Sequence, residues 1–153
     1  MSNVILRDTY NVLVNKIKEL KKEVRENSNQ IGEAADFGDL RENAEYKAAK
    51  ERQAMLFSQL NRLEPYLTAI IIEKKEIGPE VVSYGTTVKL KDLVTQKVVS
   101  YTFVGPVEYE LEIYPSIVTF TSPLGKALVG KKKGESVDIE SSKFLILDIE
   151  AAS

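Results

Sequence analysis

Two runs of residues at alternating steps of three and four place the strongest constraint on the fold of this 153-residue chain. The first seam consists of Tyr10, Leu13, Ile17, Leu20, Val24, Asn27, Ile31 and Ala34. The second consists of Tyr46, Ala49, Gln53, Leu56, Leu60, Leu63, Leu67 and Ile70. Both are largely apolar, with one polar amide each, as is typical of coiled-coil helices. The pattern therefore predicts two helices that pack against each other.

The segment between the seams, Asp36-Phe37-Gly38-Asp39, is long enough only for a tight reversal. The two helices should therefore run antiparallel as a hairpin, with the reversal at its far tip. At about 1.5 Å per residue, the first helix, from about Tyr10 to Ala35, is on the order of 40 Å long. Pro65 should kink or break the second helix, because proline lacks an amide donor and crowds the preceding turn. We expect this hairpin to form a domain over residues 1–75.

The pattern changes after residues 76–79 to short runs of β-branched and aromatic residues, which are typical of strands. The expected strands are residues 86–90, 98–104, 117–121, 137–139 and 144–149. Ser122 is the expected N-cap of a short helix that runs through Leu128. The chain is thus predicted to be an α+β protein, with a small α+β domain over residues 80–153 after the coiled-coil hairpin.

The chain has neither cysteine nor histidine. This composition excludes disulfides, thiolate chemistry and catalytic triads that need histidine. Any metal site must rest on carboxylates, which favour hard ions such as magnesium. The longest aliphatic run, Ala69-Ile70-Ile71-Ile72, is far shorter than the roughly 20 apolar residues that span a bilayer, and the N-terminus does not resemble a secretory signal. We expect a cytoplasmic protein that does not associate with membranes.

Acidic residues are concentrated between the two seams. Residues 33–45 contain Glu33, Asp36, Asp39, Glu42 and Glu45 but only one base, Arg41. Asp39 and Glu42 allow two interpretations. As N-cap and third helical residue they would form a capping box that stabilises the start of the second helix. As a pair of carboxylates at an exposed tip they could instead share a magnesium ion, whose roughly six ligands would have to be completed by another macromolecule.

Two stretches of the sequence resemble a known family. Residues 38–46, Gly38-Asp39-Leu40-Arg41-Glu42-Asn43-Ala44-Glu45-Tyr46, followed by Lys47-Ala48-Ala49-Lys50-Glu51, are similar to the tip signature of the Gre transcript-cleavage factors, and nearer to its GreA than its GreB form. Residues 122–131, Ser122-Pro123-Leu124-Gly125-Lys126-Ala127-Leu128-Val129-Gly130-Lys131, with Gly134-Glu135 after them, resemble the FKBP-like C-terminal domain of that family. The resemblance covers both halves of the chain in the family's order.

The resemblance implies an accessory factor rather than an enzyme. The hairpin would enter the secondary channel of a backtracked bacterial RNA polymerase, where Asp39 and Glu42 would help to hold the second catalytic magnesium ion and the attacking water. The polymerase would then cleave its own transcript. The implied partners are RNA polymerase and the nascent RNA 3′ end, with DNA only inside the elongation complex, and we expect a monomer. Many GreA-type proteins carry a basic residue and a histidine where this chain has Ala35 and Phe37.

Basic residues group on one side of the first predicted helix, at Lys18, Lys21, Lys22 and Arg25. The family resemblance associates such a patch with the displaced RNA end, whereas the alternative is a solvated helix face paired with neighbouring glutamates. Two other functions are open: a Gre-like inhibitor of the polymerase, and a peptidyl-prolyl isomerase or chaperone with an FKBP-like fold. The presence of both Asp39 and Glu42 favours cleavage over inhibition. The lack of tryptophan disfavours the aromatic pocket of an isomerase.

Overall fold

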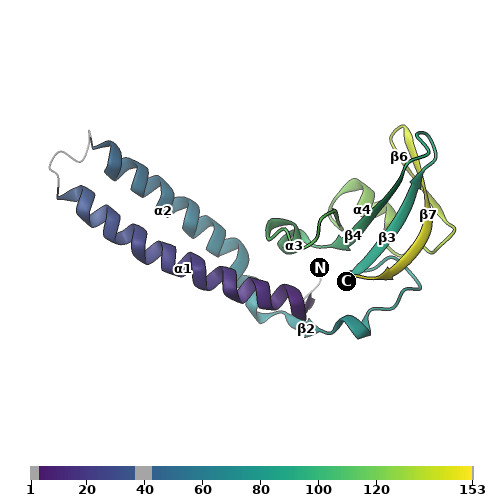
Figure 1. Ribbon diagram of the computed structural model, residues 1–153, viewed down its shortest axis with the longest axis horizontal. Coiled ribbons are helices and arrows are strands. Elements are labelled where there is room, and N and C mark those ends of the chain that lie inside the picture. Colours follow the sequence, from purple (N-terminus) through teal and green to yellow (C-terminus); the bar gives the residue numbers. More distant parts are fainter. Residues whose placement is uncertain (1–3, 37–42, 153) are drawn as a thin grey trace. The chain divides into compact units, whose positions relative to one another are not determined.

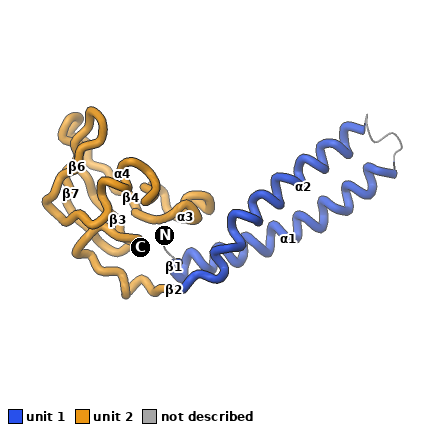
Figure 2. The backbone as a smooth tube through the Cα atoms, turned by 180° about the vertical axis from the view of Figure 1, so that it is seen from behind, with its two compact units in different colours: residues 1–70 blue, residues 71–153 orange. Residues whose placement is uncertain are grey.

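The computed structural model describes residues 4–36 and 43–152 and divides into two compact units. The units are Met1–Ile70 and Ile71–Ser153 (Figure 2). The division falls a few residues before the change of sequence pattern at residues 76–79. Within the described residues, no helix has both the length and the apolar character required to cross a membrane.

The first unit is built on two long helices that lie side by side (Figure 1). They are α1 (Arg7–Ala35) and α2 (Ala44–Leu63), and this confirms the predicted helical pair. Most of the residues that the two helices bury are apolar and belong to the predicted seams. In α1 these are Leu13, Ile17, Leu20 and Ala34, and in α2 they are Ala49, Leu56, Leu60 and Leu63. Burial of this interface is the main source of helix stability in such a hairpin.

The base of the hairpin departs from the sequence prediction. The α2 helix ends at Leu63 and is followed by the 3₁₀ helix η1 (Glu64–Thr68), which has Pro65 in its first turn, so the predicted break is confirmed. The helical seam does not continue to Ile70, which lies in strand β2 (Ile70–Ile72) with 63% of its surface exposed. β2 pairs with β1 (Val4–Leu6) in a two-stranded sheet that the helical pattern did not predict. Three consecutive β-branched residues favour the strand once the helix has ended.

The second unit contains a five-stranded sheet in the order β5-β4-β3-β7-β6. Its strands are β3 (Thr86–Asp92), β4 (Val98–Val104), β5 (Ile117–Thr119), β6 (Ser136–Ile139) and β7 (Ser142–Ala151). The pairings are antiparallel except for β4 with β5, which is parallel. Every strand predicted from the sequence is present, and the α+β fold class is confirmed. The short helix η2 (Lys74–Glu76) precedes the sheet.

Short helices α3 (Pro106–Glu110) and α4 (Pro123–Leu128) accompany the sheet. The hydroxyl of Ser122 accepts a hydrogen bond from the Gly125 amide at 3.1 Å, which confirms Ser122 as the N-cap of α4. Residues from β3, β4, β7 and α4 form one apolar core, which includes Leu90, Phe103, Leu128 and Ile146. Leu128 thereby packs α4 against the sheet. The sequence predicted α4 but not α3.

Candidate functional site

The described ends of the two long helices lie on either side of residues 37–42. The catalytic and metal-binding residues predicted from the sequence, Asp39 and Glu42, lie outside the described residues, as does Phe37. The last helical residue before them is Ala35, and the first after them is Ala44. The assignment of Asp39 and Glu42 to a magnesium site therefore stays a prediction.

The described start of α2 differs from the capping-box interpretation, and Asp39 and Glu42 themselves lie outside the described residues. The N-cap of α2 is Asn43, which has the extended backbone of an N-cap, with φ −79° and ψ 101°. Its side-chain oxygen accepts a hydrogen bond from the Tyr46 amide at 3.0 Å. Asn43 thus provides the hydrogen bond that an N-cap residue gives to the third amide of its helix. The α2 helix begins at Ala44, after the acidic pair in the sequence.

Asn43 also connects the two helices at this end of the hairpin. Its Nδ2 group donates a hydrogen bond to the carbonyl oxygen of Ala34 at 2.6 Å. Ala34 is in the last turn of α1, where carbonyl groups lack partners within the helix. One side chain thus satisfies the start of α2 and the end of α1 together. Sequence reasoning missed this residue, although an asparagine directly before an unbroken helical stretch is a helix-start signal.

Acidic residues flank a shallow groove near this end of the hairpin. The groove has a volume of about 400 Å³ and is lined by Gln30, Glu33, Ala34, Glu45, Ala48, Ala49 and Arg52. Glu33 comes from α1 and Glu45 from α2, and both are exposed, as is Asp36. Within residues 4–36 and 43–152, acidic side chains do not gather in a group of three or more that could hold a metal ion. The negative charge of these residues instead adds to the charge that the sequence concentrates between the helices.

The predicted RNA-binding residues all lie on α1 with exposed side chains. They are Lys18, Lys21, Lys22 and Arg25. One of the neighbouring glutamates that could have paired with them, Glu23, is instead 3.9 Å from the guanidinium of Arg52 on α2. The basic side chains are thus accessible to an RNA phosphate, and their role stays a prediction.

Four aromatic residues of the second unit, Tyr101, Phe103, Phe120 and Phe144, lie in or pack against its apolar core. The rings of Phe103 and Phe120 pack against each other with centroids 6.3 Å apart, and Phe103 is 1% exposed. Tyr101 and Phe144 also pack against the apolar core. Tyr109, which borders a surface hollow beside β5, has 65% of its surface exposed. These aromatic residues thus divide between the apolar core and the surface hollow, which Tyr114 also borders.

Comparison with known proteins identifies the same family over nearly the whole chain. The family model described as transcription elongation factor, N-terminal, matches residues 3–72, and that of the GreA/GreB C-terminal domain matches residues 77–151. Transcription elongation factor GreA of Chloroherpeton thalassium is 43% identical over 139 residues, which cover 90% of this chain and 87% of the relative. GreA of Helicobacter pylori strain Shi470 is 39% identical over 148 residues, which cover 92% and 88%.

Similar solved structures include GreA factor homolog 1 (Gfh1) of Thermus thermophilus. That structure is 24% identical in sequence, with a TM-score of 0.48, and the match covers 99% of this chain and 100% of the other. Both family models and the two GreA relatives agree on one assignment for both halves of the chain. The chain therefore belongs to the GreA/GreB family of transcription elongation factors.

Proposed function

We propose that this chain stimulates RNA polymerase to cleave backtracked RNA, with Asp39 and Glu42 delivered to the polymerase active site at the end of the helical hairpin. Its family membership makes it a transcription elongation factor that assists RNA polymerase and is not itself an enzyme. The observation that carries the proposal is the side chain of Asn43, which caps α2 and bonds to Ala34 of α1. Asn43, which follows the acidic pair in the sequence, thus caps α2 and joins the described ends of α1 and α2.

The donor set fits a magnesium ion that is shared with the polymerase. Asp39 and Glu42 provide hard carboxylate oxygens, which magnesium prefers, but two side chains supply only part of its roughly octahedral shell. The polymerase would contribute the remaining ligands, so binding by the isolated chain should be weak. When bound, the ion would supply a Lewis acid beside the scissile phosphodiester. The contribution of the chain is to bring two negative side chains to that point on a pair of packed helices.

The basic residues of α1 would act on the RNA rather than on the metal. Arg25 lies about ten residues before the end of α1, which is about 15 Å along a helix axis. A displaced RNA 3′ end that passes along the hairpin would meet these positive charges, and phosphate attraction requires no sequence readout. We expect DNA contacts only within the elongation complex, and a monomeric factor.

The test uses halted, backtracked elongation complexes of a bacterial RNA polymerase supplied with the protein and magnesium. The wild-type chain should release short 3′ RNA fragments. Asp39→Asn and Glu42→Gln should still bind the complexes but lose this activity, because each removes the charge of one carboxylate and little else. Asp36→Asn, which neutralises an exposed acid at the end of α1, is the matched control and should remain active. Retained cleavage in both site variants would reject the assignment, and a wild-type chain that slows the polymerase without cleavage would identify the inhibitor alternative.

A further inference from the structure

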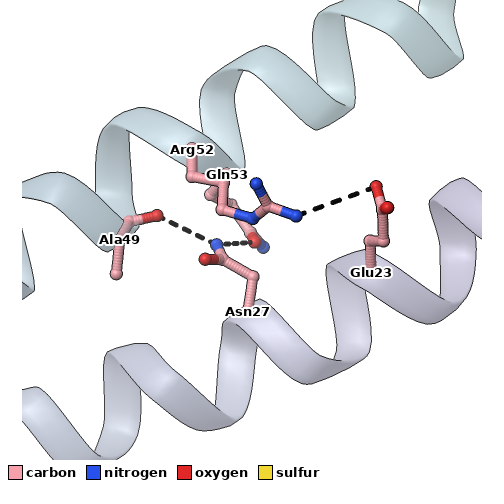
Figure 3. Close-up of polar contacts among 5 residues, drawn as sticks. All are labelled: Glu23, Asn27, Ala49, Arg52 and Gln53. Atoms are coloured by element: carbon pink, nitrogen blue, oxygen red, sulfur yellow. Dashed lines mark hydrogen bonds and ion pairs between the residues drawn. The ribbon is translucent and has the colours of Figure 1, made fainter.

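A buried amide interrupts the apolar interface between the two long helices. Asn27 of α1 is 1% exposed, and its Nδ2 group donates hydrogen bonds to the Ala49 carbonyl oxygen at 2.9 Å and to Oε1 of Gln53 at 2.6 Å (Figure 3). The amide of Gln53 in turn lies 3.4 Å from the hydroxyl of Ser28. We call Asn27, Ala49 and Gln53 the amide layer. It joins a side chain of α1 to a side chain and a backbone group of α2.

The amide layer is not the arrangement that would maximise stability. The Oδ1 atom of Asn27 is buried and has no hydrogen-bond partner within the described residues. A buried polar atom without a partner loses its hydration and regains nothing, so an apolar pair at this level should be at least as stable. A buried asparagine in a coiled coil is known as a device that selects one alignment of helices at a cost in stability. Selection of one alignment of α1 and α2 would likewise explain the stability that is lost at Asn27.

Packing on the far side of the amide layer from the base is thin. Toward the base, the buried seam residues are mostly large aliphatics such as Leu20, Leu56 and Leu60. Between the amide layer and residues 37–42, Ala34 is the buried seam residue, while Ile31 and Tyr46 are only half-buried. An alanine and two half-buried side chains interdigitate less than buried leucines do, and they therefore resist sliding of one helix along the other less strongly. Directional hydrogen bonds therefore contribute more to the alignment of the helices at this end of the hairpin than to their alignment at the base.

We propose that Asn27 and Gln53 are positioning residues for transcript cleavage, because they fix the register of α2 against α1 and so the relative placement of the helix ends at Ala35 and Ala44. A slip of one helical turn, about 5.4 Å, in one direction would bring Leu56 to the level of Gln53 and remove the side-chain acceptor of the Asn27 amide. A backbone carbonyl of the neighbouring turn would take the place of the Ala49 carbonyl. The buried amide of Asn27 would then lose one of its two hydrogen bonds, and this loss favours the observed register over its neighbours. The role in cleavage rests on the function proposed above, whereas the register itself does not.

The size of the effect follows from the tolerance of catalytic geometry. A misplacement of about 1 Å in a catalytic constellation can reduce the rate about 100-fold. A population of slipped hairpins would therefore lower the maximal cleavage rate, even when the factor binds the polymerase normally. We expect the double variant Asn27→Leu with Gln53→Leu to cleave at least about 10-fold more slowly at saturating factor. Its half-saturating concentration should stay within about threefold of wild type, and its melting temperature should be equal or higher.

Matched variants distinguish an effect on the register of the helices from an effect on the stability of the hairpin. The exchange Asn27→Gln with Gln53→Asn keeps an amide pair across the interface and should restore cleavage to within about threefold of wild type. Arg52→Gln removes the exposed ion pair with Glu23 in the same region of the hairpin, and should change neither rate nor stability. A leucine variant that loses its helical fold, or that cleaves at the wild-type rate, would overturn the proposal.

The register can also be measured without the polymerase. The chain has no cysteine, so nitroxide labels at Glu33→Cys and Lys47→Cys report one distance between exposed sites of α1 and α2. Wild type and the amide exchange should give one narrow distance distribution by pulsed electron paramagnetic resonance. The leucine variant should add a second population consistent with a slip of about 5 Å. A single distribution equal to wild type would refute the register claim, whatever the outcome of the cleavage test of Asp39 and Glu42.

Discussion

The bond of Asn43 to both helices leads to a prediction about local stability at the end of the hairpin. Asn43→Ala removes the cap on the Tyr46 amide at 3.0 Å and the donor to the Ala34 carbonyl at 2.6 Å. Loss of the cap costs about 1 kcal/mol and loss of the bond between helices about another 1 kcal/mol. The free energy for opening of the first turn of α2 should therefore fall by about 2 kcal/mol. That change corresponds to a roughly 30-fold larger open population, since about 1.4 kcal/mol is a factor of ten.

Asn43→Asp separates the two contributions. Aspartate keeps an acceptor for the Tyr46 amide and places a negative charge at the positive end of α2, which is favourable by up to about 1 kcal/mol. It cannot donate to the Ala34 carbonyl and puts a negative charge close to that oxygen. The start of α2 should thus stay protected in the aspartate variant, while its link to α1 is lost.

Native-state hydrogen exchange measures both effects at single amides. The Tyr46 amide donates to the side chain of Asn43, and the Lys47 amide donates to its backbone carbonyl at 3.1 Å. In Asn43→Ala both amides should exchange faster, by up to about 30-fold, whereas in Asn43→Asp the change should be within about fivefold. Unchanged exchange at Tyr46 and Lys47 in the alanine variant would refute the conclusion that Asn43 stabilises this end of α2.

Three further predictions concern other parts of the chain. Gly125→Ala should destabilise the second unit by about 1–3 kcal/mol in chemical denaturation, because the added Cβ would lie 2.0 Å from the Thr119 carbonyl oxygen; an unchanged midpoint would show that α4 can move away. Phe103→Ala should cost about 3–5 kcal/mol in the same assay, because a fully buried ring leaves a cavity, and a loss below about 1 kcal/mol would contradict its place in the core. Replacing the four basic residues of α1 by glutamine should reduce the salt dependence of the factor's affinity for backtracked complexes, and an unchanged slope would exclude them from RNA binding.

The elements that could be predicted from the sequence are those whose own residues determine them. The two seams contain enough large aliphatic residues, at alternating steps of three and four, to predict a helical hairpin. Pro65 ends the second helix because it has no amide hydrogen and its ring crowds the preceding turn. Ser122 and Pro123 mark the start of α4 through the same local chemistry. Such signals act within a few residues and do not depend on the rest of the fold.

The α3 helix illustrates what local signals cannot provide. Its five residues are too few to show a helical period. It depends on tertiary contacts instead: Glu108 is fully buried, and its carboxylate accepts hydrogen bonds from the Gly105 amide at 3.1 Å and from the Tyr84 hydroxyl. Gly105 is also required by packing, because a Cβ there would lie 2.8 Å from the ring of Phe120. Tyr84 and Phe120 are distant from α3 in the sequence, so the pattern around α3 gives no indication of these two partners.

The candidate site likewise combines features that can be predicted from the local sequence with features that depend on packing. The acidic character of residues 33–45 and the family signature are readable from the sequence, and they point to Asp39 and Glu42 as the reactive pair. Asn43 carries a local helix-start signal, but a capping box at Asp39 and Glu42 satisfies local rules equally well, so the sequence alone does not choose between them. The choice between them depends on the bond of Asn43 to Ala34, which exists only once α1 and α2 have packed.

In the proposed function, the carboxylates of Asp39 and Glu42 help the polymerase to hold a magnesium ion for cleavage. The most direct measurement is the cleavage rate of backtracked complexes as a function of magnesium concentration, at saturating wild-type factor and at saturating Asp39→Asn with Glu42→Gln. The wild-type factor should lower the magnesium concentration required for half-maximal cleavage, and the double variant should leave it at the value of polymerase alone. Equal magnesium dependence with the wild-type and the double-variant factor would contradict the claim.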